Sequence, residues 1–428
     1  MKSKASKLAI DFSPLKKYPD FRNLWSAGLI SYLGSMITYV ALPFQIKELT
    51  GSYLAVGLLG IIEITPLIIF GLYGGVLADS VDRKKLIWAT EAGALLIVTG
   101  LLLNSLLAEP SLIAIYIAAG LFACVDGLQR PSMGAILPRL VSHEDLPSAS
   151  NLLTLRWQIG FILGPTLGGI IFSTFSIEVG YGFDIATYLV SLIFLARVRN
   201  IPPSKEAEKP SLAALLEGIR YALGRKDLLA TYLIDLAAMF FAMPTALFPF
   251  WAAELKANWA LGLFYSAGIT GSIIITLTSG WSRTYRYHGR AVIWAAIGWG
   301  TAIALAGVTN SLILVLICLA VAGASDQVSA LFRTVIWNQT IPDNLRGRLA
   351  GIELLSYSVG PLAGQMRAAS MAAAFSLSFS VTAGGIICVV VVAILALLIP
   401  EFRKYDVETN KYALAERENR KNREDLNE

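Results

Sequence analysis

Two carboxyl groups lie inside long apolar stretches of this sequence. Glu63 falls near the middle of the stretch Tyr53–Leu77, one turn before Pro66. A charged side chain at the centre of a bilayer costs about 2.5 to 3.5 kcal/mol on insertion scales, so such a residue is a functional candidate. Burial favours the protonated form of a carboxyl group, and exchange between a protonated and a released state is what a proton-driven antiporter needs. We expect Glu63 to couple protons, or to be a hydrogen-bonded structural residue between helices.

Asp235 is the second acidic candidate. The sequence Met243-Pro244-Thr245 follows it and predicts a break in the helix. Discontinuous helices border the central cavity of many transporters, so we expect Asp235 at a cavity or in coupling. The alternative is an interhelical hydrogen bond. Tyr39, Phe240 and Phe241 are candidates to line a cavity for an aromatic or amphipathic cargo, with lipid-facing positions as the equal alternative.

Pairs of opposite charge recur near the ends of two further stretches. Asp126 and Arg130 are four residues apart, so they lie on one helix face and can pair with each other. The sharper hypothesis pairs Arg130 with Asp79 to hold an inner gate shut. Asp326 and Arg333 repeat the arrangement in the second half.

Other ionisable residues lie nearer the predicted helix ends. For Glu91, Arg156, Asp184 and Glu353 we expect snorkelling or helix capping rather than function. Arg367 is expected near the outer end of its helix, facing water.

The composition places all these residues in a membrane. Of 428 residues, 55% are hydrophobic and 15% are charged, whereas soluble domains carry roughly 25% charged residues. Apolar runs of about 20 residues recur along the chain, the length that a helix needs to cross a bilayer. The fold class is therefore an all-α polytopic membrane protein. The net charge of +5 lies in short loops and forms no basic face, so no nucleic-acid partner is expected.

The apolar runs predict about twelve spans in two sets of six. They are 24–46, 53–77, 86–107, 112–130, 152–175 and 183–196, then 228–250, 259–281, 291–308, 312–331, 350–373 and 375–399. Basic residues gather in alternate loops, which places both termini in the cytoplasm and the protein in the cell (inner) membrane. The predicted parts are a cytoplasmic N-terminus (1–22), a first six-helix bundle (23–198), a linker (199–226), a second bundle (227–400) and a cytoplasmic tail (401–428).

The linker and the tail are the only long polar segments inside this plan. In the linker, apolar residues from Leu212 to Leu223 repeat at helical spacing after Ser211, which predicts a short amphipathic helix on the membrane surface. The tail mixes both charge signs, and we expect a solvated or frayed helix there.

A glycine motif recurs in the two halves. It has the form Gly-Pro-x-x-Gly, and its members are Gly164, Pro165 and Gly168 in the fifth span and Gly360, Pro361 and Gly364 in the eleventh. Two six-span halves with a substrate site between them near the midplane are a known transporter plan.

One loop carries a more specific motif. The segment GGVLADSVDRKK lies between the second and third spans and includes Gly75, Asp79 and Arg83. Its glycines allow close helix approach, and its acid and basic cluster suit a latch. Here the chain resembles the major facilitator superfamily, whose motif at this loop is G-x-L-A-D-x-x-G-R-K/R, with Asp82 standing where that family usually has glycine. Stretches such as LRGRLAGIELLSYSVGPLAG resemble its drug-efflux branch.

The resemblance implies export coupled to inward proton movement, with a drug or a siderophore such as enterobactin as cargo. It covers nearly the whole chain from Phe21 to Pro400, and its GPxxG motif is associated with antiporters. A proton symporter that imports a metabolite or sugar is the alternative, and an intramembrane enzyme is a distant one. No GxxxxGK[ST] phosphate loop is present.

The remaining expectations concern ligands and partners. Three scattered cysteines and two loop histidines predict no metal site, and no cofactor is expected. The expected partners are a small-molecule substrate, protons and the lipid bilayer around a monomer.

Overall fold

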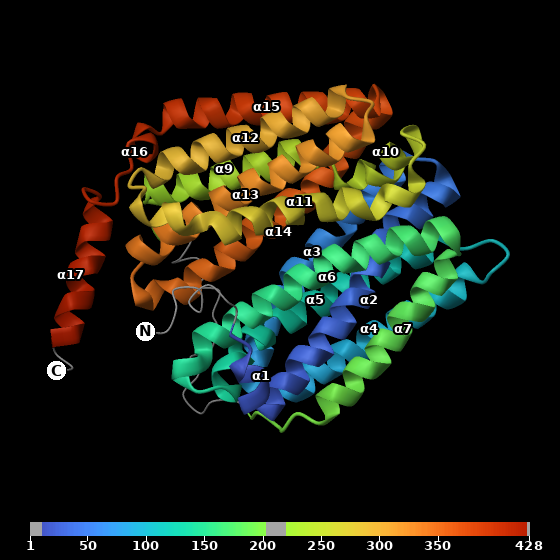
Figure 1. The fold of residues 1–428 in the computed structure, drawn as a ribbon, viewed down its shortest axis with the longest axis horizontal. Helices are drawn as coiled ribbons and strands as arrows, with labels where there is room; N and C mark the ends of the chain where they lie inside the picture. Colours follow the sequence, from blue (N-terminus) through green and yellow to red (C-terminus); the bar gives the residue numbers. More distant parts are fainter. Residues whose placement is uncertain (1–10, 203–219, 426–428) are drawn as a thin grey trace, which may run out of the picture. The chain divides into compact units, whose positions relative to one another are not determined.

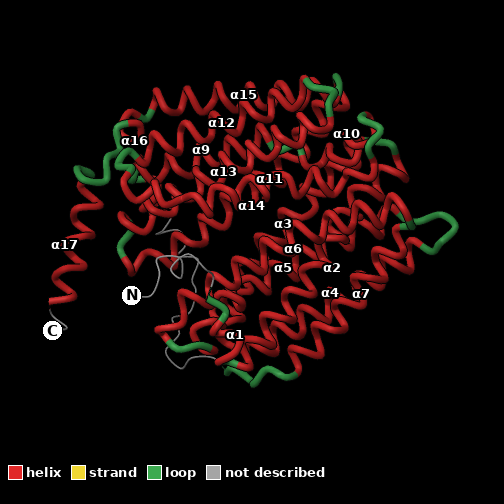
Figure 2. Tube along the Cα trace, in the orientation of Figure 1, coloured by secondary structure: helices red, strands yellow, loops and turns green. Residues whose placement is uncertain are grey.

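The computed structural model describes residues 11–202 and 220–425, without the side chains of residues 75, 76, 78, 79, 135, 283, 343–357 and 419–425. Helices account for nearly all of this described part, which contains no strand (Figure 2). The predicted all-α fold is confirmed. The predicted linker helix falls almost entirely on residues outside the description.

The helices of the first half follow each other with short connections. They are α1 (Ser13–Lys17), α2 (Pro19–Thr50), α3 (Tyr53–Ser80), α4 (Arg83–Ser105), α5 (Leu112–Leu140), η2 (His143–Asp145), α6 (Leu146–Thr174) and α7 (Ile177–Ala196).

The second half repeats the pattern with more interruptions. Its helices are α9 (Lys226–Ala242), η3 (Thr245–Leu247), α10 (Phe248–Glu254), η4 (Asn258–Ala260), α11 (Leu261–Thr278), η5 (Ser279–Thr284), α12 (His288–Val308), α13 (Leu312–Thr340), α14 (Asp343–Ala374), α15 (Leu377–Leu398), α16 (Pro400–Arg403) and α17 (Lys411–Asp425).

Eleven helical segments in the described residues are long and apolar enough to cross a membrane. The twelfth predicted span, 350–373, falls on α14, one continuous helix of 32 residues. It is not among the eleven. Its sequence is rich in Ala, Gly and Ser and carries charged residues, which lowers its hydropathy.

Several predicted boundaries change. The break predicted at Met243-Pro244-Thr245 is confirmed, since α9 ends at Ala242 and Met243 has extended backbone. The fourth span continues through Pro131 to Leu140, because neighbouring groups in a membrane protein can satisfy the carbonyl that proline leaves free. The sixth begins at Ile177, so Asp184 lies inside a helix rather than at its start.

The described residues form two compact units. One comprises residues 11–51, 62–202 and 258–266, and the other comprises 52–61, 220–257 and 267–425. We call them unit 1 and unit 2. Each contains a short piece of the opposite half of the sequence: the first turns of α11 belong to unit 1, and the first turns of α3 belong to unit 2.

Unit 1 is organised around α2. This helix packs against both α6 and α7, while α4 packs against α5 and α7. At the end where α2 begins, large apolar side chains from α2, α4, α5 and α7 meet in a closed cluster that includes Phe21, Leu24, Ile87 and Leu195. The cluster fixes the relative positions of these helix ends.

Unit 2 is organised around α12 and α9. Helix α12 lies between α13 and α15, and α9 packs against α14 and α15 (Figure 1). Small residues allow these contacts: a Cβ on Gly300 would lie 2.9 Å from the carbonyl oxygen of Gly385, and one on Gly385 would lie 2.4 Å from that of Gly300. Close backbone approach of this kind is a main source of helix association in membranes.

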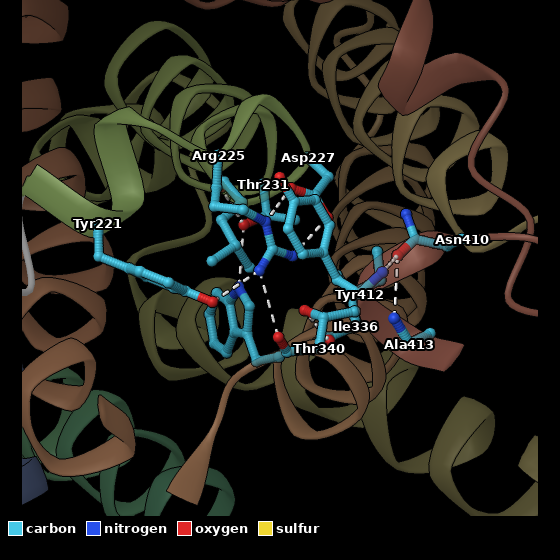
Figure 3. A network of polar contacts seen from close by, with 11 residues as sticks. Tyr221, Arg225, Asp227, Thr231, Ile336, Thr340, Asn410, Tyr412 and Ala413 are labelled. Carbon is cyan, nitrogen blue, oxygen red and sulfur yellow. Dashed lines mark hydrogen bonds and ion pairs between the residues drawn. The ribbon is translucent and has the colours of Figure 1, made fainter. Parts of the chain in front are cut away.

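The C-terminal helix α17 docks onto unit 2 through a buried arginine (Figure 3). Arg225 is 3% exposed. Its Nε and Nη2 donate to the carboxylate of Asp227 at 2.8 and 2.6 Å, and its Nη1 donates to the Tyr221 hydroxyl at 2.8 Å. Nη1 also donates to the carbonyl oxygen of Thr340, the last residue of α13, at 3.2 Å. A cation at this position complements the C-terminal end of the helix dipole.

Tyr412, at the start of α17, covers this arginine. The centre of its ring lies 3.3 Å from the guanidinium carbon. Ala413 and Glu416, on the following turns, are buried. The expectation of a solvated tail is therefore wrong for the first turns of α17. Charge composition gave no sign that one tyrosine would meet a cation more than 180 residues earlier in the chain.

A second attachment holds the segment between α16 and α17. The Arg286 guanidinium donates to the Asp406 carboxylate, with 3.0 Å between Nε and Oδ2, and the Val407 N–H donates to the Arg286 carbonyl oxygen at 3.2 Å. The hydrogen bonds from the Arg286 side chain hold the pKa of Asp406 below its usual range. The attachment is therefore fully formed near neutral pH, and it weakens only when acid protonates Asp406.

Replacing Tyr412 with alanine is expected to release α17. The variant loses a desolvated cation–π contact worth about 2 kcal/mol. Hydrogen exchange of residues 411–418 in the purified protein should therefore rise by an order of magnitude or more. Leu414→Ala, which truncates an exposed side chain of the same helix, is the control and should leave exchange unchanged. Equal exchange in Tyr412→Ala and the parent protein would contradict this account of docking.

Candidate functional site

Glu63 is the acid in the middle of unit 1 that has no partner among the described residues. It lies eleven residues into α3 and is partly buried. No described side chain or backbone group hydrogen-bonds to it. Another acid, Asp126 of α5, lies within range of its charge, and so does Tyr39 of α2. The carboxyl group is thus held in the helix bundle without a described counter-ion.

Asp126 and Arg130 pair with each other. The distance between Arg130 Nη2 and Asp126 Oδ2 is 2.6 Å, and the two side chains are 42% and 46% exposed. This is the contact that four-residue helical spacing allows. The competing pair with Asp79 concerns a side chain outside the described residues. Charged groups exposed near the centre of a span avoid lipid and face polar surroundings, so they mark a polar face of unit 1.

Glu91 is a buried network residue, not a capping one. Its Oε1 accepts hydrogen bonds from Gln129 Nε2 at 2.9 Å and from Ser31 Oγ at 3.3 Å, while its Oε2 accepts one from Ser191 Oγ at 3.0 Å. The donors come from α5, α2 and α7. Sequence position alone suggested a residue near a helix end. Three helices that pack around α4 enclose it instead.

Asp184 is also misjudged from its sequence position. It is fully buried and accepts hydrogen bonds from Thr38 at 2.5 Å and Thr187 at 3.2 Å. Thr38 lies on α2, so this contact ties α7 to α2. The spacing of polar residues on α2 contained the signal, since Ser31, Thr38 and Gln45 recur every seven residues and are all buried.

In unit 2, Asp235 pairs with Arg333 across two helices. Asp235 Oδ2 on α9 lies 2.5 Å from Arg333 Nη1 on α13, and both side chains are less than 10% exposed. Asp326 lies farther off, with 3.9 Å between its Oδ1 and Arg333 Nη2. The predicted repeat of the Asp126 and Arg130 pair is therefore different in detail, because in unit 2 the arginine binds an acid from a neighbouring helix.

The three aromatic candidates are partly buried. Tyr39 packs against Phe161 at 6.3 Å and edge-on to Tyr265 at 5.7 Å between ring centres. Phe240 and Phe241 pack edge-to-face at 4.9 Å. Their contacts neither require nor exclude a role in lining a cavity, so that role stays a prediction. Arg367, expected to face water, instead donates from Nε to the Phe240 carbonyl oxygen at 3.2 Å.

The two GPxxG motifs are helix-packing surfaces. A Cβ on Gly164 of α6 would lie 2.4 Å from Met36 Cβ and 2.8 Å from the Leu33 carbonyl oxygen on α2. A Cβ on Gly364 of α14 would lie 2.5 Å from the Met239 carbonyl oxygen on α9, and one on Gly360 would lie 3.0 Å from Met239 Cβ. The same motif therefore packs α6 on α2 in unit 1 and α14 on α9 in unit 2.

Each motif also contacts the short segment that its unit contains from the opposite half of the sequence, which is 258–266 in unit 1 and 52–61 in unit 2. A Cβ on Gly262, at the start of α11, would lie 2.1 Å from the Pro165 carbonyl oxygen. At the start of α3, a Cβ on Gly60 would lie 2.1 Å from the carbonyl oxygen of Leu362, the residue after Pro361. In each unit the motif thus packs on one helix through its own glycines, while the start of another helix approaches its proline turn through a glycine.

The predicted latch is only partly described. Gly75 and Asp79 lie in the last turns of α3, and their side-chain positions fall outside the description. Arg83 is buried, and its backbone N–H donates to the Ile201 carbonyl oxygen at 3.1 Å. Asp82 caps α4 by accepting from the Lys85 N–H at 3.1 Å. An N-cap role explains an aspartate at this position. No group of three or more metal-binding side chains occurs in the described residues.

Comparisons with known proteins agree with this architecture. The family described as "Transmembrane secretion effector" matches residues 9–423. The enterobactin exporter EntS of Shigella boydii serotype 18 is 30% identical over 404 residues, which cover 92% of this chain and 95% of that protein. The EntS of Escherichia coli O81 shows the same identity and coverage.

Solved structures show the same fold at low sequence identity. A single-site mutant of the nucleoside transporter NupG matches with a TM-score of 0.72 and 13% identity over 90% of this chain and 98% of that one. A bacterial homologue of the iron transporter ferroportin, in an inward-facing state, matches with a TM-score of 0.69 and 14% identity over the same shares.

Substitution of Asp235 tests whether the pair with Arg333 is structural. Asp235→Asn leaves a buried guanidinium without its counter-charge, which is expected to cost about 3 to 5 kcal/mol of stability. The double variant Asp235→Leu, Arg333→Leu should recover most of it, because both charges are removed. Thermal unfolding in detergent measures both. Glu401→Gln, which breaks the exposed pair with Lys226, is the control and should cause no measurable change.

Gly164→Ala tests the packing role of the motif. The added methyl group collides with α2, so we expect a loss of about 1 to 3 kcal/mol. Gly182→Ala is the matched control, because a Cβ there meets nothing within 4 Å. If unfolding curves of the two variants coincide, the motif has no packing role in unit 1.

Proposed function

Because the chain belongs to the transmembrane secretion effector family of the major facilitator superfamily, and is thus a multi-pass membrane transporter, we propose that it exports a small amphipathic molecule in exchange for protons by alternating access. The proton gradient is the energy source of this proposal. Its direction, outward for the cargo, follows the relatives that are named as exporters.

The single observation that carries proton coupling is the state of Glu63. Of the acids within the spans of unit 1, Glu91 and Asp184 are each held by several donors, and Asp126 is paired with Arg130. Glu63 has no described hydrogen-bond donor or counter-ion, and it lies on the same unit as the polar face marked by Asp126. A carboxyl group without fixed partners is free to exchange a proton at little structural cost.

Asp235 takes a second place in the proposal. Its pair with Arg333 supports a structural role, but a buried acid and arginine can also exchange partners when a proton binds. In that case protonation of Asp235 releases Arg333, whose other acidic neighbour is Asp326. The pair would then link proton binding to movement of α13 against α9.

The proposed topology places both termini in the cytoplasm of the cell from which cargo leaves. The chain acts as a monomer in the inner membrane, and residues 23–198 and 227–400 are the two moving halves. The excess of Lys and Arg in the loops on the side of both termini supports this orientation. The cargo class is a drug or a siderophore, since 30% identical relatives are enterobactin exporters.

Transport by everted membrane vesicles tests the proposal. With the parent protein, cargo uptake into everted vesicles should occur when respiration acidifies the lumen, and a protonophore should abolish it. Enterobactin and a hydrophobic dye serve as the two trial cargos. Glu63→Gln should lower proton-driven uptake at least tenfold, because the amide takes up no proton. Full activity of this variant would exclude Glu63 from coupling.

The matched control removes an acid outside the membrane core. Glu109 is exposed in the loop between α4 and α5, so Glu109→Gln should retain full uptake. Uptake that persists with the protonophore would contradict proton coupling. Transport only in right-side-out vesicles would instead support the importing symporter.

A further inference from the structure

Arg156 is a cation in unit 1 that is enclosed without a partner. It lies on α6, eleven residues from its start, and it is partly buried. Its Nη1 is shut off from solvent and has no hydrogen-bond acceptor. Among the described residues, no carboxylate lies within 4 Å of it. A guanidinium without hydrogen-bond acceptors inside a helix bundle is costly, so it indicates a partner that comes from elsewhere.

The packing around Arg156 shows that it is not there to fill space. One turn before it, the Leu152 carbonyl oxygen accepts from Trp25 Nε1 at 2.8 Å, and one turn after it, Gly160 meets the Tyr32 ring. The Nη1 end of the guanidinium approaches Gly28 of α2, where a Cβ would be 2.1 Å from Nη1 and 2.8 Å from Cζ. Arg156 thus occupies the space that the missing side chain of Gly28 leaves between α6 and α2.

The acids around Arg156 are already engaged. Glu91 is the acid whose charge reaches it, but both oxygens of Glu91 accept hydrogen bonds from other helices. Asp126 is paired with Arg130. Glu63 has Asp126 and Tyr39 within range of its charge and makes no ion pair with Arg156. Glu91 thus supplies a nearby charge, but no described acid contacts the guanidinium.

The other two nitrogens of the guanidinium are available. Nε and Nη2 are not enclosed and donate to no described residue, while contact with Gly28 fixes the orientation of the group. The Nε and Nη2 edge of an arginine matches the two oxygens of a carboxylate. Tyr32, whose ring meets Gly160 one turn further along α6, can pack against an aromatic ring.

We propose that Arg156 binds an oxyanion of the cargo, a carboxylate on an aromatic group, through Nε and Nη2. This inference rests on the proposed function, because it assigns the cargo class of the same transporter. An oxyanion at this edge would supply the hydrogen-bond acceptors that no described residue offers to Nε and Nη2.

Equilibrium binding of two probes of equal shape tests the proposal. Salicylate carries a carboxylate where salicylamide has a neutral amide. For the purified protein in nanodiscs at pH 7, we expect salicylate to bind about tenfold more tightly than salicylamide, the preference that one charge-assisted hydrogen-bond pair provides. In Arg156→Gln this preference should vanish while salicylamide affinity is kept. Arg156→Lys should keep part of it.

Two further variants separate binding from folding. Gly28→Ala retains the arginine but pushes its guanidinium aside, so the preference for salicylate should fall. Arg139→Gln removes an equal charge from an exposed position in the same unit and should leave the preference intact. A parent protein without preference, or an Arg156→Gln variant that keeps it or loses both probes equally, overturns the proposal.

The binding measurement does not depend on proton drive or direction. If vesicle transport persists with the protonophore while the salicylate preference depends on Arg156, the anion site stands and proton-driven export is wrong. If transport succeeds while the preference is absent, the cargo class alone is wrong.

Discussion

Close backbone contact between helices is the constraint on which this structure depends. Inside a membrane, apolar side chains gain little by leaving lipid for protein, so association relies on van der Waals contact at short distance and on buried polar groups. The glycines of α6 against α2 and of α14 against α9 provide that contact in the two units. In each unit this contact also positions the proline turn of a GPxxG motif against the start of another helix, which approaches it through a glycine.

The charged side chains within the helices of the two units are neutralised in different ways. In unit 2, Arg333 pairs with Asp235 from α9. The first glycine of each GPxxG motif meets a Leu and a Met, which are Leu33 and Met36 on α2 and Leu236 and Met239 on α9. The residue before the Leu is Asp235 on α9 but Tyr32 on α2, so unit 1 has no acid at this place. Arg130 therefore turns to Asp126 of its own helix. Within the spans of unit 1, Glu63 and Arg156 have no hydrogen bond or ion pair with a described residue, and both proposals build on this observation.

Unit 2 has a further fixed point that unit 1 lacks. Arg225 joins the start of α9, the end of α13 and the start of α17 by hydrogen bonds and a ring contact (Figure 3). The cation is desolvated on all sides yet fully paired, so it makes these three segments move together. The tail is thus part of the helical unit, and any movement of α13 is transmitted to it.

The sequence by itself determined the helical membrane class, the break after Ala242 and the repeated glycine motif. It also predicted about twelve apolar spans, one more than the eleven in the described residues. These follow from local composition and spacing, which a bilayer constrains strongly. Only the tertiary structure decided the partners of the charges. It showed that Glu91 and Asp184 are enclosed by donors from other helices, that Asp235 faces Arg333, and that Arg156 lies unpaired on Gly28. The side of a helix that meets its neighbour depends on residues far away in the chain, so span position alone could not distinguish a capping residue from a buried one.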